Sequence, residues 1–297
     1  MAEIEVNSIN KSYFKKAAVS NLSFTVDKDE IFGLIGPNGA GKTTTIRMIM
    51  DIIKPDSGEI KIFGEKISEK IKNKLGYLPE ERGLYKRLTV MESMIYLASL
   101  KGVDNIIAEK RGTELLKKIG MQDTINKKIQ ELSKGMGQLI QFVITIINDP
   151  NLIILDEPFS GLDPINTELL KNLIIDLKNQ GKTVILSIHQ MSQVEELCDR
   201  ILMIDGGESV LYGNLKEIKT KYRDNSIILT YEGELGQIPG VKNRKEKDGY
   251  TQLFLENHTL PEQILKILMD KNITINRFEI AEPTLNEIFL KVAKKKP

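Results

Sequence analysis

The segment Gly36 to Thr43, which reads GPNGAGKT, constrains the fold of this chain more than any other stretch. It follows the apolar run Ile31 to Ile35, and a helical pattern begins near Lys42. Spaced glycines let backbone N–H groups surround phosphate oxygens, a lysine supplies charge to the β- and γ-phosphates, and a threonine hydroxyl contacts Mg²⁺. A plain glycine-rich turn is the alternative, but the flanking strand and helix argue against it. The segment therefore predicts a nucleotide-binding loop.

The residues that we expect to contact the nucleotide from this loop are consecutive. Within the loop, Lys42 is expected to reach the β- and γ-phosphates, and Thr43 to offer its hydroxyl to Mg²⁺. The predicted contacts are Gly36, Pro37, Asn38, Gly39, Ala40, Gly41, Lys42, Thr43 and Thr44.

Two further apolar runs, NLIILDE and TVILSIH, are typical of central strands in a parallel sheet covered on both faces. The first ends in Asp156 and Glu157, and the second ends in His189. Acidic residues at a strand end are often only solvated, but open α/β sheets bind ligands at the carboxyl ends of their strands. With a phosphate loop in the same chain, we expect Asp156 to hold Mg²⁺ through water and Glu157 to activate the attacking water. His189 is expected to sense the γ-phosphate through a hydrogen bond rather than to be an ordinary half-buried histidine.

The region between the first and the later central strands is predicted to be helical. Thr89 and Glu92 form a capping box before an apolar helical pattern, and Asp104 opens a second helix that stops at Gly120. No strand signal interrupts this region. We therefore expect an inserted helical subdomain over about residues 85–145.

Other segments flank this core. LSFTV and EIKIFG alternate apolar and polar residues, as half-buried strands do, and IDGGESVLYG predicts a hairpin. Asp163 with Pro164 is expected to open a helix, and a capping box of Ser192 and Glu195 to open the next.

The pattern restarts after a polar stretch from Lys216 to Asn225, which suggests a domain boundary there. SIILTYE, YTQLFLE and ITINRFEI read as strands, and helices are expected from about Leu260 to Asp270 and after the capping box of Thr284 and Glu287. We therefore predict a domain of residues 1–215 followed by a small α+β domain of residues 216–297.

Composition excludes some classes of protein. Lys+Arg 42 against Asp+Glu 41 gives a net charge of +1, which argues against a dedicated DNA-wrapping surface. The single cysteine, Cys198, cannot form an intramolecular disulfide, and its apolar neighbours predict a buried thiol. No segment has the roughly 18 uninterrupted apolar residues of a membrane span, and the N-terminus lacks a signal-peptide pattern. We expect a soluble cytoplasmic protein whose membrane role requires a partner.

The stretch LSKGMGQLIQ, from Leu132 to Gln141, predicts a second anion-binding position. Ser133 is a natural N-cap for a helix whose apolar residues recur at helical spacing. The unpaired N–H groups and the dipole at a helix N-terminus attract anions. No phosphate-binding lysine pattern lies here, so this position needs a function other than a second phosphate loop.

Together these motifs resemble the ATPase subunits of ABC transporters. The phosphate loop, the LSKGM signature, IILDE, the SGLD loop from Ser160 to Asp163 and His189 occur in that family's order and spacing, over about residues 1–215. The resemblance implies a P-loop α/β fold with an antiparallel N-terminal β subdomain, a central mostly parallel sheet and the inserted helical subdomain. The tail EPTLNEIFL, Glu282 to Leu290, is similar to the end of the accessory domain in ATPases that pair with separate export permeases, of the sodium-efflux and antibiotic-efflux type.

The resemblance also implies roles for single residues. Tyr13 matches the aromatic residue that stacks on adenine, and Glu80 in YLPEER stands where the family usually has a glutamine that senses the γ-phosphate and the metal. A carboxylate cannot donate the hydrogen bond of an amide, so Glu80 is expected to keep only the Mg²⁺ contact. Two other departures are Lys134, in place of the first glycine of the usual signature, and Asp29, where a glycine commonly precedes the strand.

In this family the signature of one subunit closes over the nucleotide on the P-loop of another. The resemblance therefore implies that Ser133 and Gly135 contact the ATP of a partner, in a homodimer or a heterodimer with a paralogous ATPase subunit. It further implies ATP hydrolysis that requires Mg²⁺, with Lys42, Glu80, Glu157 and His189 as the catalytic residues. The energy would drive export through a separate integral-membrane permease, with this chain peripheral at the inner face of the cell membrane.

Two other classes of protein fit these motifs less well. An ABC ATPase acting on nucleic acid or on the ribosome usually carries long coiled-coil insertions or two cassettes, and the sequence has neither, so no direct nucleic-acid contact is expected. A P-loop kinase or GTPase would leave LSKGMGQ without a function. The cargo stays open between sodium, a drug, a peptide and a lipid. For the C-terminal domain, dimer support and regulation are both compatible with the sequence.

Overall fold

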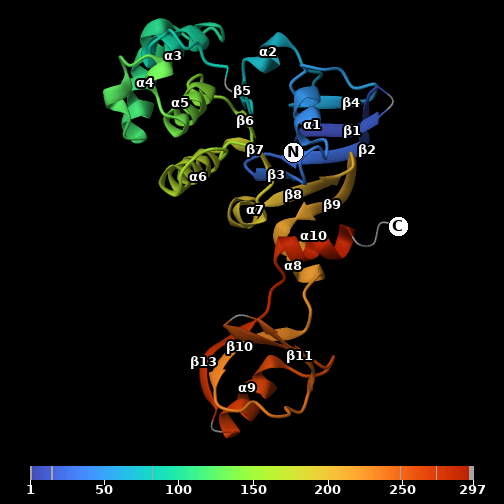
Figure 1. Ribbon diagram of the computed structural model, residues 1–297. Helices are drawn as coiled ribbons and strands as arrows, with labels where there is room; N and C mark the ends of the chain where they lie inside the picture. The colour runs from blue at the N-terminus through green and yellow to red at the C-terminus, as the bar shows by residue number, and fades with distance from the viewer. Residues whose placement is uncertain (1, 15, 82, 248, 272, 294–297) are drawn as a thin grey trace. The chain divides into compact units, whose positions relative to one another are not determined.

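The computed structural model describes residues 2–14, 16–81, 83–247, 249–271 and 273–293. The chain divides into two compact units, Met1–Leu215 and Lys216–Pro297, and the second is coloured orange to red in Figure 1. Within the described residues, no helix is both long enough and apolar enough to cross a lipid bilayer.

A mixed sheet with the strand order β5, β6, β7, β3, β8, β9 forms the centre of the first unit. The parallel strands are β5 (Leu75–Leu78), β6 (Leu152–Asp156), β7 (Thr183–Ile188), β3 (Ile31–Ile35) and β8 (Arg200–Asp205). β9 (Glu208–Asn214) pairs antiparallel with β8, which confirms the predicted hairpin. All residues of β3, β6 and β7 are buried. Coverage of both faces explains why these strands are apolar without alternation.

An antiparallel sheet with the order β2, β1, β4 flanks the central sheet, as expected. Its strands are β1 (Ala2–Tyr13), β2 (Lys16–Asp27) and β4 (Ser57–Ile62). Their buried apolar residues share one core with the central sheet and with α1 (Lys42–Ile49). In that core the rings of Phe24 and Phe32 are stacked with centroids 5.6 Å apart. This shared core fixes the strand that leads into the phosphate loop.

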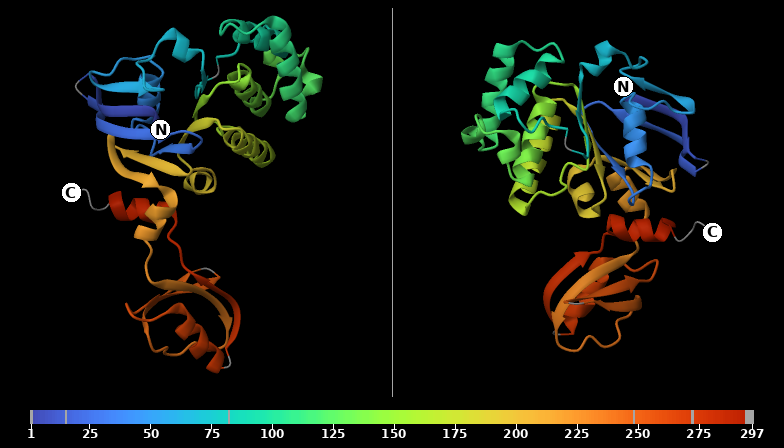
Figure 2. Two further views of the ribbon diagram at one scale, coloured as in Figure 1. Left: turned by 180° about the vertical axis from the view of Figure 1, so that it is seen from behind. Right: turned by 45° about the horizontal axis from the view of Figure 1, so that its top comes forward.

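Helices α3 (Val90–Ser99), α4 (Asn105–Lys118) and α5 (Lys134–Ile146) form the predicted helical group, which is green in Figure 1 and in both views of Figure 2. Thr89, Asp104 and Ser133 cap these helices, each side chain accepting a hydrogen bond from a backbone N–H of the first turn. The predicted N-caps are therefore confirmed. The short helices nearby are α2 (Glu69–Lys72), η1 (Gln122–Thr124) and η2 (Ile129–Glu131).

Two helices follow the strands that carry the predicted catalytic residues. Asp163 caps α6 (Pro164–Asn179), with Pro164 at its first position, as predicted. The predicted cap at Ser192 is wrong, because the N-cap of α7 (Met191–Leu197) is Gln190, two residues earlier. The chain passes from β7 into this helix within a few residues, so Ser192 already lies in the first turn. The predicted burial of Cys198, which follows α7, is confirmed, and burial raises the pKa of its thiol.

The second unit contains an antiparallel sheet with the order β11, β12, β10, β13. Its elements are β10 (Ser226–Glu232), β11 (Val241–Lys247), β12 (Tyr250–Leu255), α9 (Pro261–Asp270), β13 (Thr274–Ile280) and α10 (Leu285–Ala293). Apolar residues of the sheet pack against Ile264 and Leu268 of α9. α8 (Leu215–Lys221) occupies part of the polar stretch from Lys216 to Asn225, for which no helix was predicted. β11 was not predicted, because its sequence, VKNRKEK, is polar and mostly exposed.

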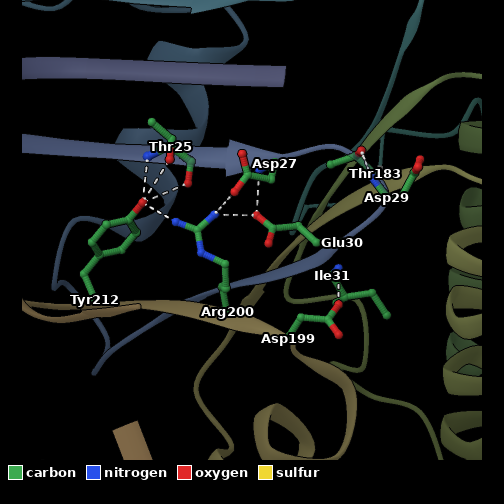
Figure 3. Close-up of polar contacts among 9 residues, drawn as sticks. All are labelled: Thr25, Asp27, Asp29, Glu30, Ile31, Thr183, Asp199, Arg200 and Tyr212. Carbon is green, nitrogen blue, oxygen red and sulfur yellow. Dashed lines mark hydrogen bonds and ion pairs between the residues drawn. The ribbon is translucent and has the colours of Figure 1, made fainter. Parts of the chain in front are cut away.

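A polar cluster joins the two sheets of the first unit near the amino end of β3 (Figure 3). Arg200 Nη1 donates to Asp27 Oδ2 at 2.8 Å and to Glu30 Oε1 at 3.1 Å, and its guanidinium lies 5.3 Å from the centre of the Tyr212 ring. Burial raises the pKa of the Glu30 carboxyl. Beside this cluster, Asp29 has a φ of 61°, in the left-handed region that glycine favours. The departure from glycine at this position therefore falls in a turn.

Candidate nucleotide-binding and catalytic site

The phosphate loop connects β3 to α1 and depends on glycine at two close approaches. At Gly36, φ is 146° and a Cβ atom would lie 2.1 Å from the Ile204 carbonyl oxygen. At Gly41, φ is 112° and a Cβ atom would lie 2.5 Å from the Ala18 carbonyl oxygen. Any larger residue would collide with backbone at either position, so glycine is what allows the loop to curl before the helix. The free N–H groups at the start of α1 favour an anion at this loop.

Backbone carbonyl oxygens of the loop hold the side chain of Lys42 over it. Its ammonium donates to the carbonyl oxygens of Gly36 at 2.8 Å and Pro37 at 3.3 Å, and lies 3.7 Å from Glu157 Oε1. The side chain is only 6% exposed. A nearly buried ammonium beside a glycine loop supplies strong positive charge to a phosphate, because the local dielectric is low.

Glu157 and His189 meet at the ends of two neighbouring strands. His189 Nδ1 lies 2.7 Å from Glu157 Oε2. Glu157 follows β6 with a φ of 51°, a conformation that is uncommon for a residue other than glycine. Its N–H donates to the Ser187 carbonyl oxygen at 3.1 Å. Residues held in such conformations often serve a site, and here the conformation directs the carboxylate toward both Lys42 and His189.

Asp156 is the last residue of β6 and is fully buried. Burial raises the pKa of its carboxyl. Neither carboxylate oxygen forms a hydrogen bond of normal geometry with a described residue, and neither does the hydroxyl of Ser187, opposite Asp156 in the register of β6 and β7. The Ser187 and Thr43 hydroxyls nevertheless lie close enough to lower the pKa of the carboxyl against the larger effect of burial. Buried polar atoms are rarely left without a partner. Such unpaired oxygen atoms suit a hard cation. Ser187 was not predicted, although it is the polar residue of the otherwise apolar run VILSI.

A cavity of about 380 Å³ opens over the phosphate loop, and several of the predicted residues line it. Glu80, which follows β5, lies at this cavity with Lys42 and Glu157. The cavity is lined by Ala18, Asn38, Gly39, Gly41, Lys42, Thr43, Thr44, Glu80 and Glu157. No cluster of three or more His, Cys, Asp or Glu that could hold a metal occurs in the described part of the chain. Mg²⁺ in nucleotide sites usually has one or two carboxylate ligands, with substrate phosphates completing the shell, and Asp156, Glu80 and the Thr43 hydroxyl fit that requirement.

Gly36, Pro37, Ala40, Asp156 and His189 are not among the residues that line this cavity, although His189 contacts Glu157, which does. Three further predicted residues, described next, also do not line it. Tyr13, at the end of β1, is half exposed, with the ammonium of Lys11 5.9 Å from the centre of its ring. Ser133 caps α5, its hydroxyl accepting from the Met136 N–H at 3.2 Å, and Gly135 lies in the first turn of the same helix. The roles of these three residues in ATP binding stay predictions.

Comparison with known proteins places this site in a family. Residues 19–160 match the family model of the ABC transporter, and residues 213–293 match that of the ATP-binding protein DrrA1-3-like, C-terminal domain. The chain is 38% identical over 301 residues to the linearmycin resistance ATP-binding protein LnrL of Bacillus subtilis (strain 168), covering 97% of each chain. The chain belongs to the ABC transporter ATP-binding proteins. Both the family and the fold predicted from the sequence motifs are thereby confirmed.

Export-related proteins and solved cassettes also resemble this ABC ATPase. It is 31% identical over 299 residues to the Nod factor export ATP-binding protein I of Rhizobium etli, covering 98% of this chain and 93% of the relative. A solved dimeric ATP-binding cassette, bound to ADP and Pi in a post-hydrolysis state, matches with a TM-score of 0.67 at 25% identity, covering 71% of this chain and 98% of that one. These comparisons support ATP binding and ATPase activity. They give no support to the nucleic-acid alternative.

Proposed function

We propose that this ABC ATPase works as a dimer, either of two copies or with a paralogous subunit, which binds two ATP at its interface and drives export through a separate membrane permease. The observation that carries the proposal is the junction of Lys42, Glu157 and His189 over the phosphate loop. The export-related relative and the dimeric cassette described above support the direction of transport and the dimer.

The residues of the loop bind and orient the triphosphate. Lys42 and the N–H groups at the start of α1 neutralise the β- and γ-phosphates. Glu157 accepts a proton from the water that attacks the γ-phosphate in line, a role typically worth about 10²- to 10⁴-fold in rate. His189 holds the Glu157 carboxylate and contacts the γ-phosphate. Asp156, Thr43 and Glu80 would hold Mg²⁺, which when bound neutralises charge that develops on the phosphate oxygens.

The second half of each site comes from the partner subunit. Of the described residues, neither Ser133 nor Gly135 is among those that line the cavity over the chain's own phosphate loop. Their helix start is suited to an anion, because the first N–H groups of a helix have no carbonyl partner within it, and the Ser133 side chain is exposed. An ATP held by the phosphate loop of another subunit is the anion that we assign to this position.

The helical subdomain provides a surface for the permease. Tyr85 and Tyr96 are exposed and pack edge to face with centroids 5.5 Å apart, and Leu100, Ile106 and Ile107 are exposed as well. An exposed aromatic pair with further exposed apolar side chains in the same subdomain suits a protein contact. Docking of this surface on a permease would place the chain on the cytoplasmic face of the cell membrane.

The test compares ATP binding with ATP turnover in the purified chain. Lys42→Ala should lose nucleotide binding, whereas Glu157→Gln should keep binding, lose turnover by about 10²-fold or more and accumulate an ATP-bound dimer. Glu262→Gln, an exposed change on α9, is the matched control and should behave as the parent protein. Turnover by Glu157→Gln near the native rate would contradict the assignment of the base.

A further inference from the structure

Helix α5 has two buried glutamines among the apolar side chains of its core-facing side. Gln138 and Gln141 are only 3% and 5% exposed, and they lie on the same side of the helix because they are three residues apart. Their buried neighbours on α5 include Leu139, Ile140 and Phe142. Burying an amide is costly unless it forms hydrogen bonds. The partners of these two amides therefore indicate what they do.

Gln138 binds the chain next to the proposed base. Its Nε2 donates to the Pro158 carbonyl oxygen at 3.1 Å, and Pro158 directly follows Glu157. The φ of 51° at Glu157 is one that residues other than glycine rarely adopt, and it persists only where the surroundings hold it. The Glu157 N–H donates to the Ser187 carbonyl oxygen and its C=O accepts from the Ser160 N–H, both at 3.1 Å. The bond from Gln138 fixes the next carbonyl group in the chain and so helps to keep Glu157 in this conformation.

Gln141 binds the chain next to Glu80. Its Nε2 donates to the Glu81 carbonyl oxygen at 3.4 Å, and its Oε1 is buried without a hydrogen-bond partner among the described residues. A buried acceptor without a partner lowers stability, so an apolar side chain of similar size would serve the fold about as well. The amide therefore suits a role other than stability, and its one bond places that role at the segment that carries Glu80.

We propose that Gln138 and Gln141 are positioning residues for the two carboxylates at the ATP cavity, Glu157 and Glu80. The inference rests on the proposed roles of these carboxylates as base and metal ligand. Both line the cavity over the phosphate loop, and each follows the carboxyl end of a strand, β6 for Glu157 and β5 for Glu80. Because one helix donates to the chain beside both carboxylates, its two amides fix the position of one carboxylate relative to the other.

The first experiment replaces Gln138 by methionine, which keeps the length of the side chain but removes the donor. Gln138→Met should lower kcat by roughly tenfold to a hundredfold and leave KM for ATP nearly unchanged, because a misplacement of about 1 Å can cost that much in rate. Thr145→Val is the matched control, since it removes a buried hydroxyl of the same helix that contacts the Tyr77 carbonyl oxygen inside β5. Its kcat should stay near the native value. A native kcat in Gln138→Met, or an equal loss in the control, would overturn the positioning role.

The second experiment shows whether Gln138 acts through Glu157. In the Glu157→Gln protein, which lacks the base, adding Gln138→Met should change the residual rate by less than about twofold, because residues that act as one unit are non-additive. A purely structural effect of Gln138 would appear in full in both backgrounds, and that result would overturn the inference. If Glu157→Gln alone turns over at the native rate, the assignment of the base fails, and the role of Gln138 fails with it.

The test of Gln141 measures Mg²⁺-dependent binding of a fluorescent ATP analogue, which requires no hydrolysis. Gln141→Met should raise the Mg²⁺ concentration for half-maximal binding roughly tenfold, as expected for a group that orients a metal ligand. Its melting temperature should not fall, because the substitution removes the unpaired buried oxygen. In a Glu80→Ala background, Gln141→Met should cause no further shift. An unchanged Mg²⁺ dependence, or a further shift in the Glu80→Ala protein, would overturn the role of Gln141, whereas no shift in Glu80→Ala alone would show that the proposed metal contact of Glu80 fails first.

Discussion

His189 Nδ1 and Glu157 Oε2 lie 2.7 Å apart at the ends of β7 and β6, which are neighbours in the central sheet. One hydrogen-bonding contact thus links the proposed base to the proposed γ-phosphate sensor. The imidazole is about half exposed, whereas the carboxylate is almost buried. Loss of the imidazole should therefore change the orientation of Glu157 more than the stability of the fold.

We predict that His189→Ala lowers ATP turnover by at least about tenfold but less than the 10²- to 10⁴-fold expected for loss of the base itself. His189→Gln can still form one hydrogen bond to Glu157 and should fall between the two. ATPase rates measured at saturating ATP, together with melting temperatures, check this. Native turnover in His189→Ala would mean that the histidine has no part in hydrolysis.

A second prediction concerns Glu80 and Mg²⁺. If the carboxylate acts mainly through the metal, Glu80→Gln should retain part of its hydrolysis with a shifted Mg²⁺ dependence, because an amide oxygen is a weaker ligand than a carboxylate for a hard cation. Glu80→Ala should lose most activity. The measurement is ATPase rate across a Mg²⁺ titration. Identical curves for all three proteins would identify Glu80 as a solvated surface residue.

The third prediction tests whether the signature acts on the nucleotide of a partner. Lys42→Ala and Gly135→Asp should each be inactive alone, the latter because it adds negative charge to an anion site. A mixed dimer combines both lesions in one composite site and leaves the other intact, so ATP trapping or slow turnover should return and peak near equal amounts.

The control for this mixture is Gly135→Ala, because the added Cβ atom meets only ordinary contacts at 3.7 Å and leaves the charge unchanged. Trapped nucleotide per dimer is measured beside turnover, with tagged pull-down to show that mixed dimers form. An inactive mixture without trapped nucleotide, although mixed dimers are present, would argue against action between subunits.

The fourth prediction separates the effect of Asp156 on the stability of the protein from its role in hydrolysis. Its folded-state pKa is raised by burial, so the folded protein holds this proton more tightly than the unfolded chain does. The free energy of unfolding therefore falls as pH rises above the unfolded pKa of about 3.9, and stays lower at neutral pH. Asp156→Asn should raise stability at pH 7 by about 1–2 kcal/mol, with the gain shrinking toward pH 4, while Mg²⁺-dependent hydrolysis is lost.

Urea unfolding of the nucleotide-free protein at several pH values measures this effect. Asp163→Asn is the control, because asparagine keeps the N-cap acceptor of α6 and the pKa of the exposed Asp163 carboxyl is lowered by the Asn166 N–H, not raised. It should show no gain at neutral pH. An Asp156→Asn protein that is less stable than the parent protein at pH 7 would mean that the buried carboxylate has partners other than a cation.

Local signals in the sequence were sufficient for most of the fold. The caps at Thr89, Asp104 and Ser133 depend on a few adjacent residues, and the buried strands depend on unbroken apolar runs. β5 was missed because it has only four residues, and its burial comes from pairing with β6, about 75 residues away in the chain. β11 was missed for the opposite reason, since it is an exposed edge strand with few apolar residues.

The site was predictable where one motif supplies several groups and less so where strands must be brought together. The phosphate loop follows from the spacing of its own residues. The proximity of the strand ends follows from the parallel arrangement of the sheet. The position of Ser187 opposite Asp156, in contrast, depends on the register of β6 and β7, which no short stretch of sequence specifies. The place of Glu80 came from the resemblance to the family, because nothing in YLPEER alone directs it to Lys42.

The buried thiol of Cys198 has a practical consequence for the study of subunit contacts. Its sulfur is packed so closely that an added Cβ atom at Gly33 would lie 2.8 Å from it, and burial raises its pKa. A thiol of this kind is almost unreactive, because alkylating reagents attack the accessible thiolate. Spin labels or fluorophores can therefore be attached at introduced surface cysteines without removing the native one, and the separation between labelled subunits can then be followed as ATP is added.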